Sequence, residues 1–158
     1  MSGYKYNDGG RAEAGYKGTT GDCVVRAIAI GTQMPYKAVY EAVNDAAKGE
    51  RIGKRKRGIS NARTGVYKET TRKVLAAMGW QWVACMQIGS GCRVHLEASE
   101  LPSGRIIAKL SRHVVAVVDG VVQDTSDPRR FEVGRKNGIP YSRVTRCVYG
   151  YWHKPANS

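Results

Sequence analysis

Acidic residues are scarce in this chain. Its 158 residues include 13 Asp and Glu against 26 Lys and Arg, so the formal net charge is +13. An excess of this size favours partners that carry negative charge, such as nucleic acids, anionic membranes, acidic proteins or acidic substrates. Composition alone does not distinguish among these partners.

Long apolar runs are also lacking. No apolar run approaches the length of about 20 residues that a membrane-spanning helix needs. Residues 1–18, MSGYKYNDGGRAEAGYKG, hold no apolar segment like the core of a signal peptide. We therefore expect a cytoplasmic protein that makes no contact with a membrane. In that compartment cysteines stay reduced, and we expect four free thiols, at Cys23, Cys85, Cys92 and Cys147.

Paired metal-ligand motifs are lacking too. The spacing from Cys85 to Cys92 and on to His95 resembles part of a zinc site. A structural zinc site usually shows two closely spaced ligand pairs, and the chain has no clean example. We therefore expect no bound metal and no other cofactor. The plain interpretation is a pair of core or loop thiols beside a loop histidine, and a zinc-supported nucleic-acid binder stays open as a third hypothesis.

The order of periodic segments predicts the fold class. Helical spacing of apolar residues occurs near 22–32 and again in 34–51 and 64–80. Strand patterns follow, at 80–88, 105–110, 113–118, 121–125 and 143–152. This order predicts an α+β fold in which N-terminal helices pack on a mostly antiparallel C-terminal sheet. We expect an irregular arm over residues 1–18 and a single domain over 19–153.

Residues 48–63, KGERIGKRKRGISNAR, carry seven Lys and Arg with one Glu and show no apolar face. We expect an exposed loop, either simply solvated or in contact with phosphate groups. No base-reading helix or aromatic stacking platform adjoins it, so nucleic-acid binding there would be nonspecific and strongly salt-dependent. The candidate contacts are Lys54, Arg55, Lys56 and Arg57. A second basic cluster comprises Arg129, Arg130, Arg135 and Lys136.

Cys23 stands at the start of the first predicted helix, in GTTGDCVVRAIAIGT (18–32). Backbone amides at a helix N-terminus, together with a nearby imidazolium, lower the pKa of a thiol and so favour the reactive thiolate. We expect the side chain of Thr20 or Asp22 to cap this helix. Cys23 is therefore a candidate nucleophile, and a buried core cysteine is the alternative.

The stretch HVVAVVDGVVQDT (113–125) predicts a hairpin that places a histidine beside a carboxylate. Asp-Gly between two β-branched runs is typical of a two-residue turn, which pairs Val118 with Val121 and Ala116 with Gln123. Side chains alternate along a strand, so His113 and Asp124 share a face. We expect His113 to act as general base and acid and Asp124 to orient its ring, unless His113 is a structural histidine.

These residues resemble the papain-like cysteine peptidase superfamily. GDCVVRAIAI opens a helix, HVVAVVDG follows much later as a strand, and VVQDT comes next, as in that architecture. The resemblance covers about residues 18–152 and implies a catalytic triad of Cys23, His113 and Asp124. The chain also resembles small proteins that bacteria and their phages encode, which implies a bacterial host cell.

The family commonly places a Gln or Asn before the cysteine to complete the oxyanion hole. This chain has neither between Gly9 and Cys23. The backbone amide of Cys23 can supply one donor. The second donor stays open among Thr19, Thr20 and Lys17.

The leading hypothesis is a papain-like thiol hydrolase. It would cleave a peptide, isopeptide or amide bond of a peptide or protein substrate through a thioester on Cys23, or pass the acyl group to an amine as a transferase. The alternative is a papain-like scaffold without turnover. It would bind nucleic acid or an acidic protein through its basic loop.

Overall fold

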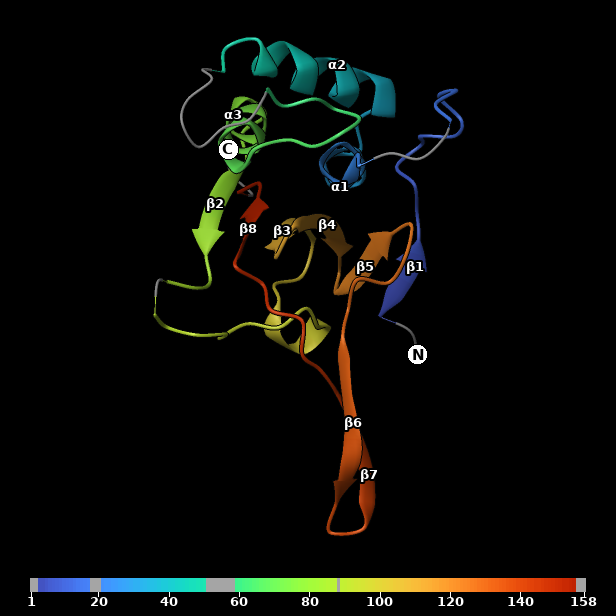
Figure 1. Ribbon diagram of the computed structural model, residues 1–158, viewed down its shortest axis with the longest axis vertical. Helices are drawn as coiled ribbons and strands as arrows, with labels where there is room; N and C mark the ends of the chain where they lie inside the picture. Colours follow the sequence, from blue (N-terminus) through green and yellow to red (C-terminus); the bar gives the residue numbers. More distant parts are fainter. Residues whose placement is uncertain (1–2, 18–20, 51–58, 88, 156–158) are drawn as a thin grey trace.

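The computed structural model describes residues 3–17, 21–50, 59–87 and 89–155. Three helices lie on one side of a sheet (Figure 1), and all three fall where helical periodicity predicts them. They are α1 (Cys23–Thr32), α2 (Tyr36–Ala47) and α3 (Lys68–Ala77). Helix α1 packs directly on the sheet against β3 and β4, and α2 packs on both α1 and α3. The nearly continuous apolar sequence of α1 suits this buried place between two layers.

The main sheet has six strands in the order β1-β5-β4-β3-β8-β2. Their bounds are β1 (Tyr4–Tyr6), β2 (Gln81–Ala84), β3 (Arg105–Leu110), β4 (His113–Val118), β5 (Val121–Asp124) and β8 (Gly150–His153). Every neighbouring pair is antiparallel except β1 with β5. The α+β class and the mostly antiparallel sheet are therefore confirmed. The arm at residues 1–18 is less irregular than expected, because it contributes the edge strand β1.

The predicted strand at 143–152 is wrong in its bounds. Strand β7 (Ile139–Val144) ends where that segment begins, and β8 starts only at Gly150. Strand β7 instead pairs with β6 (Phe131–Lys136) in a separate two-stranded hairpin, here called the β6–β7 arm, which extends from the body (Figure 1). The turn of this arm is Asn137-Gly138, and both residues have positive φ. Asn-Gly is a strong sequence signal for such a hairpin, so the arm was predictable.

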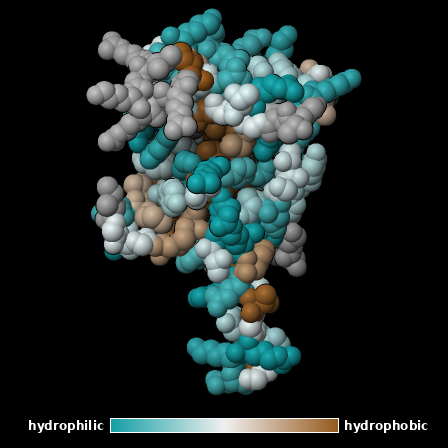
Figure 2. All heavy atoms as spheres, viewed as in Figure 1, coloured by the Kyte–Doolittle hydropathy of each residue, from teal (hydrophilic) through white to brown (hydrophobic). Residues whose placement is uncertain are grey.

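Apolar side chains cover both faces of the main sheet. On one face Ile107 and Trp152 pack against α1, with Ile28 fully buried between the layers. On the other face Leu110 and Val115 form a second core beneath the connections between strands. In contrast, the β6–β7 arm carries exposed apolar side chains among hydrophilic ones (Figure 2). Because the six strands have a core on each face, the strand ends that carry His113 and Asp124 are held rigidly.

Candidate active site

Cys23 lines a cavity of about 480 Å³. It is the first residue of α1, and its side chain is partly buried. Three segments form the walls, namely the start of α1, the loop at 64–66 and the β3–β4 turn region. The lining residues are Gly21, Cys23, Val24, Arg26, Thr64, Gly65, Val66, Lys109, Arg112, His113 and Val114.

The predicted hairpin and its register are confirmed. Asp119 and Gly120 occupy the turn with φ of 50° and 79°, as a type I′ turn requires. Val118 pairs with Val121, and the ladder continues through Ala116 with Gln123. Regular pairing stops there, so the end of β5 meets the start of β4 through side chains.

His113 and Asp124 form the hydrogen bond that the register predicts. His113 Nε2 lies 2.6 Å from Asp124 Oδ2 and donates to it. Nδ1 is then the ring nitrogen left for a third partner. Cys23 and His113 line the same cavity, and each shifts the pKa of the other. The structure therefore brings together the three residues proposed from the sequence.

The electrostatics of this group favour a thiolate beside an imidazolium. Burial by itself would raise the pKa of Cys23. The hydrogen bond and charge of His113, the backbone N–H of Val114 and the charge of Arg26 outweigh burial and lower that pKa below its usual range. For His113, burial opposes the charged form, but hydrogen bonds to Asp124 and Cys23 raise its pKa to about 9. Both shifts favour the thiolate–imidazolium pair over the neutral thiol and imidazole.

Contacts with His113, Thr125 and Arg26 keep the Asp124 carboxylate ionised. Burial would raise its pKa, but the hydrogen bond and charge of His113, the backbone N–H of Thr125 and the charge of Arg26 lower it. Arg26 Nη2 lies 3.2 Å from Asp124 Oδ1. Because Asp124 keeps its negative charge, it can hold the His113 ring in one orientation.

Asp22 does not cap α1 with its side chain, which corrects the expectation from the sequence. It makes no side-chain capping bond. Its buried carboxylate instead accepts hydrogen bonds from Arg26 and from the Tyr36 hydroxyl, the latter at 2.5 Å. Arg26 therefore bridges Asp22 and Asp124, and this bridge ties the helix start to β5. A single arginine in the apolar run CVVRAIAI was the sequence signal that could have revealed it.

We expect Arg26→Ala to lower the free energy of unfolding by about 3 kcal/mol, since it leaves two buried carboxylates without their shared cation. The Arg26 side chain is only 11% exposed, against 0% for Asp22 and 5% for Asp124. Urea denaturation measures the change. Lys48→Ala is the matched control, because its ion pair with Asp45 is 79% and 73% exposed and its loss should cost under about 1 kcal/mol. Equal effects of the two substitutions would contradict the bridging role of Arg26.

Lys109 and Arg112 are site residues that sequence reasoning missed. Both line the cavity beside Cys23. Burial lowers the pKa of Lys109, while the charge of Cys23 acts in the opposite direction. The Lys109 ammonium donates to the Leu110 carbonyl at 2.9 Å. Their strand and turn positions resemble many surface positions, so no local pattern identifies them.

Gly21 fixes the loop that forms the opposite wall. Its N–H donates to the Arg63 carbonyl at 2.7 Å, and a Cβ on Gly21 would lie 3.0 Å from the Thr64 carbonyl oxygen. The close approach therefore depends on the absence of a side chain. This close contact brings Thr64 and Gly65 to the cavity, and no sequence pattern predicts it.

The second oxyanion donor is not among the candidates that the structure describes. Lys17 has an exposed side chain, its carbonyl accepts a hydrogen bond from Arg63, and it is absent from the described lining of the cavity. Thr19 and Thr20 lie outside the described residues. The Cys23 amide lies in the first turn of α1, where backbone amides have no partner within the helix.

The basic loop residues Lys54, Arg55, Lys56 and Arg57 also lie outside the described residues. The second basic cluster does not form one patch. Arg129 and Arg130 precede β6, while Arg135 and Lys136 are at its far end, at the tip of the arm (Figure 1). Arg129 pairs with Asp127 at 2.7 Å, so part of its charge is compensated.

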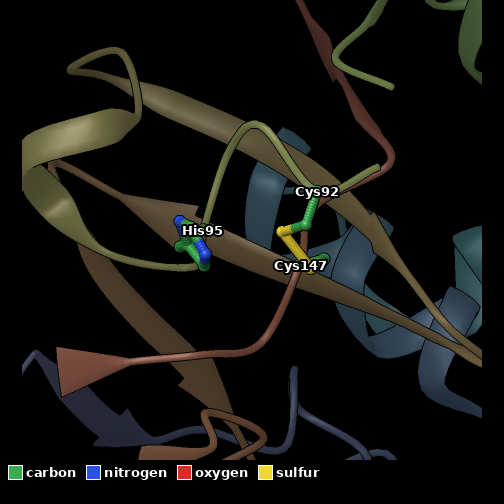
Figure 3. Close-up of side chains that lie close together, drawn as sticks. All are labelled: Cys92, His95 and Cys147. Carbon is green, nitrogen blue, oxygen red and sulfur yellow. A yellow bond between two sulfur atoms is a disulfide. The ribbon is translucent and has the colours of Figure 1, made fainter. Parts of the chain in front are cut away.

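The expectation of four free thiols is wrong. Cys92 and Cys147 form a disulfide across 55 residues of sequence, with Cα atoms 5.7 Å apart (Figure 3). Cys23 and Cys85 are free. From the sequence, the short spacing made Cys85 the expected neighbour of Cys92. Spacing along the chain cannot show that the connection before β8, which carries Cys147, folds over the loop that carries Cys92.

No protein-family model matches this chain, and neither does a curated protein or a solved structure. Among the residues that the structure describes, no helix combines the length and the apolar character needed to cross a bilayer.

Proposed function

We propose that the protein is a thiol hydrolase of papain-like arrangement that cleaves a peptide, isopeptide or amide bond. The observation that carries the proposal is that Cys23 and His113 line one cavity, while buried Asp124 lies behind His113 and accepts its hydrogen bond at 2.6 Å. A nucleophile at a helix start, a base on a strand and an orienting carboxylate on the next strand are the parts that acyl transfer needs.

The reaction follows from the charges of the pair. The Cys23 thiolate attacks the carbonyl carbon, and the Cys23 amide stabilises the oxyanion. His113 gives its proton to the leaving nitrogen as the C–N bond breaks, which leaves an acyl thioester on Cys23. Neutral His113 then takes a proton from water, whose oxygen attacks the thioester. The products are a carboxylic acid, an amine and the regenerated ion pair.

The charge of the cavity favours an anionic group on the substrate. Its described lining includes the cations Lys109 and Arg112 and no Asp or Glu, while the third cation, Arg26, is already paired with Asp22 and Asp124. An adjoining hollow beyond His113 also contains Arg112, together with Arg130 and Arg146. These cationic walls attract acidic side chains or a terminal carboxylate.

A panel of fluorogenic peptides that carry Glu, Gln or Lys beside the scissile bond tests the proposal. We expect the highest kcat/KM with Glu. We expect Lys109→Gln or Arg112→Gln to reduce that value about tenfold while leaving the Gln substrate little changed, because one charge-assisted contact is lost. A preference for the Lys peptide would contradict the role of the cationic walls. No Cys23-dependent cleavage of any substrate would contradict hydrolysis.

A second candidate function rests on the same arginines. The hollow lined by Arg112, Arg130 and Arg146 could hold a phosphate backbone in a protein without turnover. In that case affinity for DNA or RNA would fall steeply with salt, and replacement of Cys23 would leave it unchanged. An acidic protein would compete for the same surface. Either role is compatible with the cytoplasm of a bacterial host cell, where we propose the protein acts.

A further inference from the structure

A second group of reactive side chains lies away from the cavity. Cys92 and His95 belong to the connection after β2, and Cys147 lies between β7 and β8 (Figure 3). One ligand atom from each of the three lies within 4.8 Å of the other two. Soft sulfur and imidazole ligands in this number are those that Zn²⁺ takes.

The backbone holds these two segments together independently of the disulfide. His95 and Cys147 face each other in an antiparallel bridge. Leu96 N–H donates to the Arg146 carbonyl at 2.9 Å, and Val148 N–H donates to the Val94 carbonyl at 2.8 Å. The ligands therefore stay near one another when the sulfur–sulfur bond is broken.

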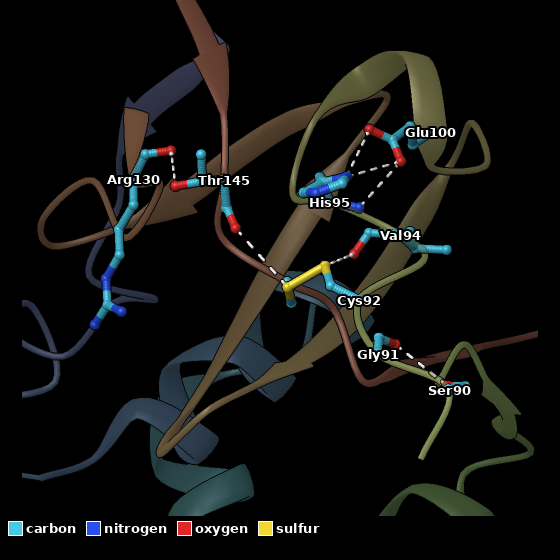
Figure 4. The surroundings of a disulfide bond; sticks show 9 residues. Ser90, Gly91, Cys92, Val94, His95, Glu100, Arg130 and Thr145 are labelled. Atoms are coloured by element: carbon cyan, nitrogen blue, oxygen red, sulfur yellow. Dashed lines mark hydrogen bonds and ion pairs between the residues drawn. A yellow bond between two sulfur atoms is a disulfide. The ribbon is translucent and has the colours of Figure 1, made fainter. Parts of the chain in front are cut away.

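Glu100 orients the histidine as a metal ligand requires. Both of its carboxylate oxygens lie 3.1 Å from His95 Nδ1, and one also accepts the His95 backbone N–H at 3.2 Å (Figure 4). Since Nδ1 is engaged, Nε2 is the nitrogen left for a metal. Histidine ligands in zinc sites commonly donate their other N–H to a carboxylate in this way.

We propose that reduced Cys92 and Cys147, together with His95, bind one Zn²⁺ ion, and that the disulfide is the oxidised, metal-free form of the site. Tetrahedral coordination at a Zn–S distance of about 2.3 Å separates two sulfurs by about 3.8 Å. That separation fits within the span that already encloses the three ligand atoms. Three protein ligands leave a fourth position for water or for an external ligand.

The exchange between the two forms balances with a cellular dithiol as reductant. The dithiol gives two electrons and two protons to the Cys92–Cys147 bond, which yields two thiols and an oxidised dithiol. Zn²⁺ then displaces one proton from each thiol and binds both sulfurs. Cys92 is exposed and His95 and Cys147 are partly exposed, so reductant and metal reach the site. Each form links the same two segments, and a reducing cytoplasm favours the metal form.

Titration with Co²⁺ as a spectroscopic substitute, followed by Zn²⁺, tests the site in a Cys23→Ser background, which removes the other histidine-paired thiol. The protein is reduced with a phosphine that is then removed without oxygen. We expect one equivalent of Co²⁺ with sulfur-to-metal charge-transfer absorption, displaced by Zn²⁺. Cys92→Ser or Cys147→Ser should abolish the band. His95→Ala and Glu100→Gln should weaken affinity about 10- to 100-fold, and Cys85→Ser should leave it unchanged.

Three results would overturn the metal site. The first is a reduced, folded chain that gives no thiolate charge-transfer band with equimolar Co²⁺. The second is a band that persists in Cys92→Ser or Cys147→Ser. If reduction unfolds the chain, circular dichroism decides: recovery of helix with one equivalent of Zn²⁺ supports the site, and no recovery overturns it. None of these readouts depends on hydrolysis, so they are independent of the activity of Cys23.

Discussion

His113→Ala is expected to slow alkylation of Cys23 by iodoacetamide at pH 6 by about tenfold or more. An ordinary thiol with a pKa of about 8.5 is only about 0.3% ionised at that pH. The hydrogen bond and charge of His113 lower the pKa of Cys23, so their loss returns the sulfur toward the thiol form. Part of the gain in thiolate is offset by weaker intrinsic nucleophilicity, which keeps the expected factor modest.

Cys85 provides an internal control for this measurement. It is free, and burial raises its pKa. Peptide mapping of one sample gives both rates, and the ratio of Cys23 to Cys85 should exceed about ten in the wild type and fall toward one in His113→Ala. Equal labelling of the two cysteines in the wild type would show that Cys23 is not activated.

The same ion pair predicts a pH dependence with two limbs. The reactive state needs Cys23 without its proton and His113 with it. As pH rises through about 9, His113 loses the proton that it must give to the leaving group. As pH falls through the lowered pKa of Cys23, the nucleophile is protonated. We therefore expect kcat/KM to fall on both sides, with an alkaline midpoint near 9 that His113→Ala removes.

Cys23→Ala is expected to reduce turnover of any cleaved substrate by about 10⁴-fold or more, because Cys23 is the only cysteine in the described lining of the cavity. Cys23→Ala/His113→Ala should be no slower than Cys23→Ala, since residues that act as a unit do not give additive losses. Initial rates on the best peptide of the panel measure both effects.

Cys85→Ala is the matched control for Cys23→Ala. It removes the other free thiol and should leave turnover unchanged. If the fold-loss in rate of the double variant equalled the product of the two single fold-losses, His113 would act separately from Cys23. Substantial activity in Cys23→Ala would place the reaction elsewhere in the molecule.

The central part of the site could be predicted from the sequence because it depends on local rules. The Asp-Gly turn fixed the register of β4 and β5, and side-chain alternation then placed His113 and Asp124 together. The position of Cys23 at a helix start followed from apolar periodicity. That Cys23 lies beside the His113–Asp124 hairpin was inferred from the family resemblance. In the structure α1 does pack against β4.

Features that depend on non-local packing escaped the sequence. Arg26 pairs with Asp22 in its own helix turn and with Asp124, which lies 98 residues later in the chain. No spacing rule shows which carboxylates an internal arginine meets. The link of Cys92 to Cys147 likewise depends on how the connection before β8 lies over the loop after β2. The β6–β7 hairpin is different, because its Asn-Gly turn was visible in the sequence and was overlooked.

Formation of an acyl thioester on Cys23 is the most direct test that Cys23 is the nucleophile. The protein is mixed briefly with p-nitrophenyl acetate, quenched with acid and mapped by peptide mass spectrometry, with Cys23→Ala, His113→Ala and Cys85→Ala in parallel. We expect one acetyl group on Cys23, formed with a burst of p-nitrophenol. Its formation should be slowed in His113→Ala, absent in Cys23→Ala and unchanged in Cys85→Ala. Acetylation confined to lysines, or equal on Cys23 and Cys85, would contradict this expectation.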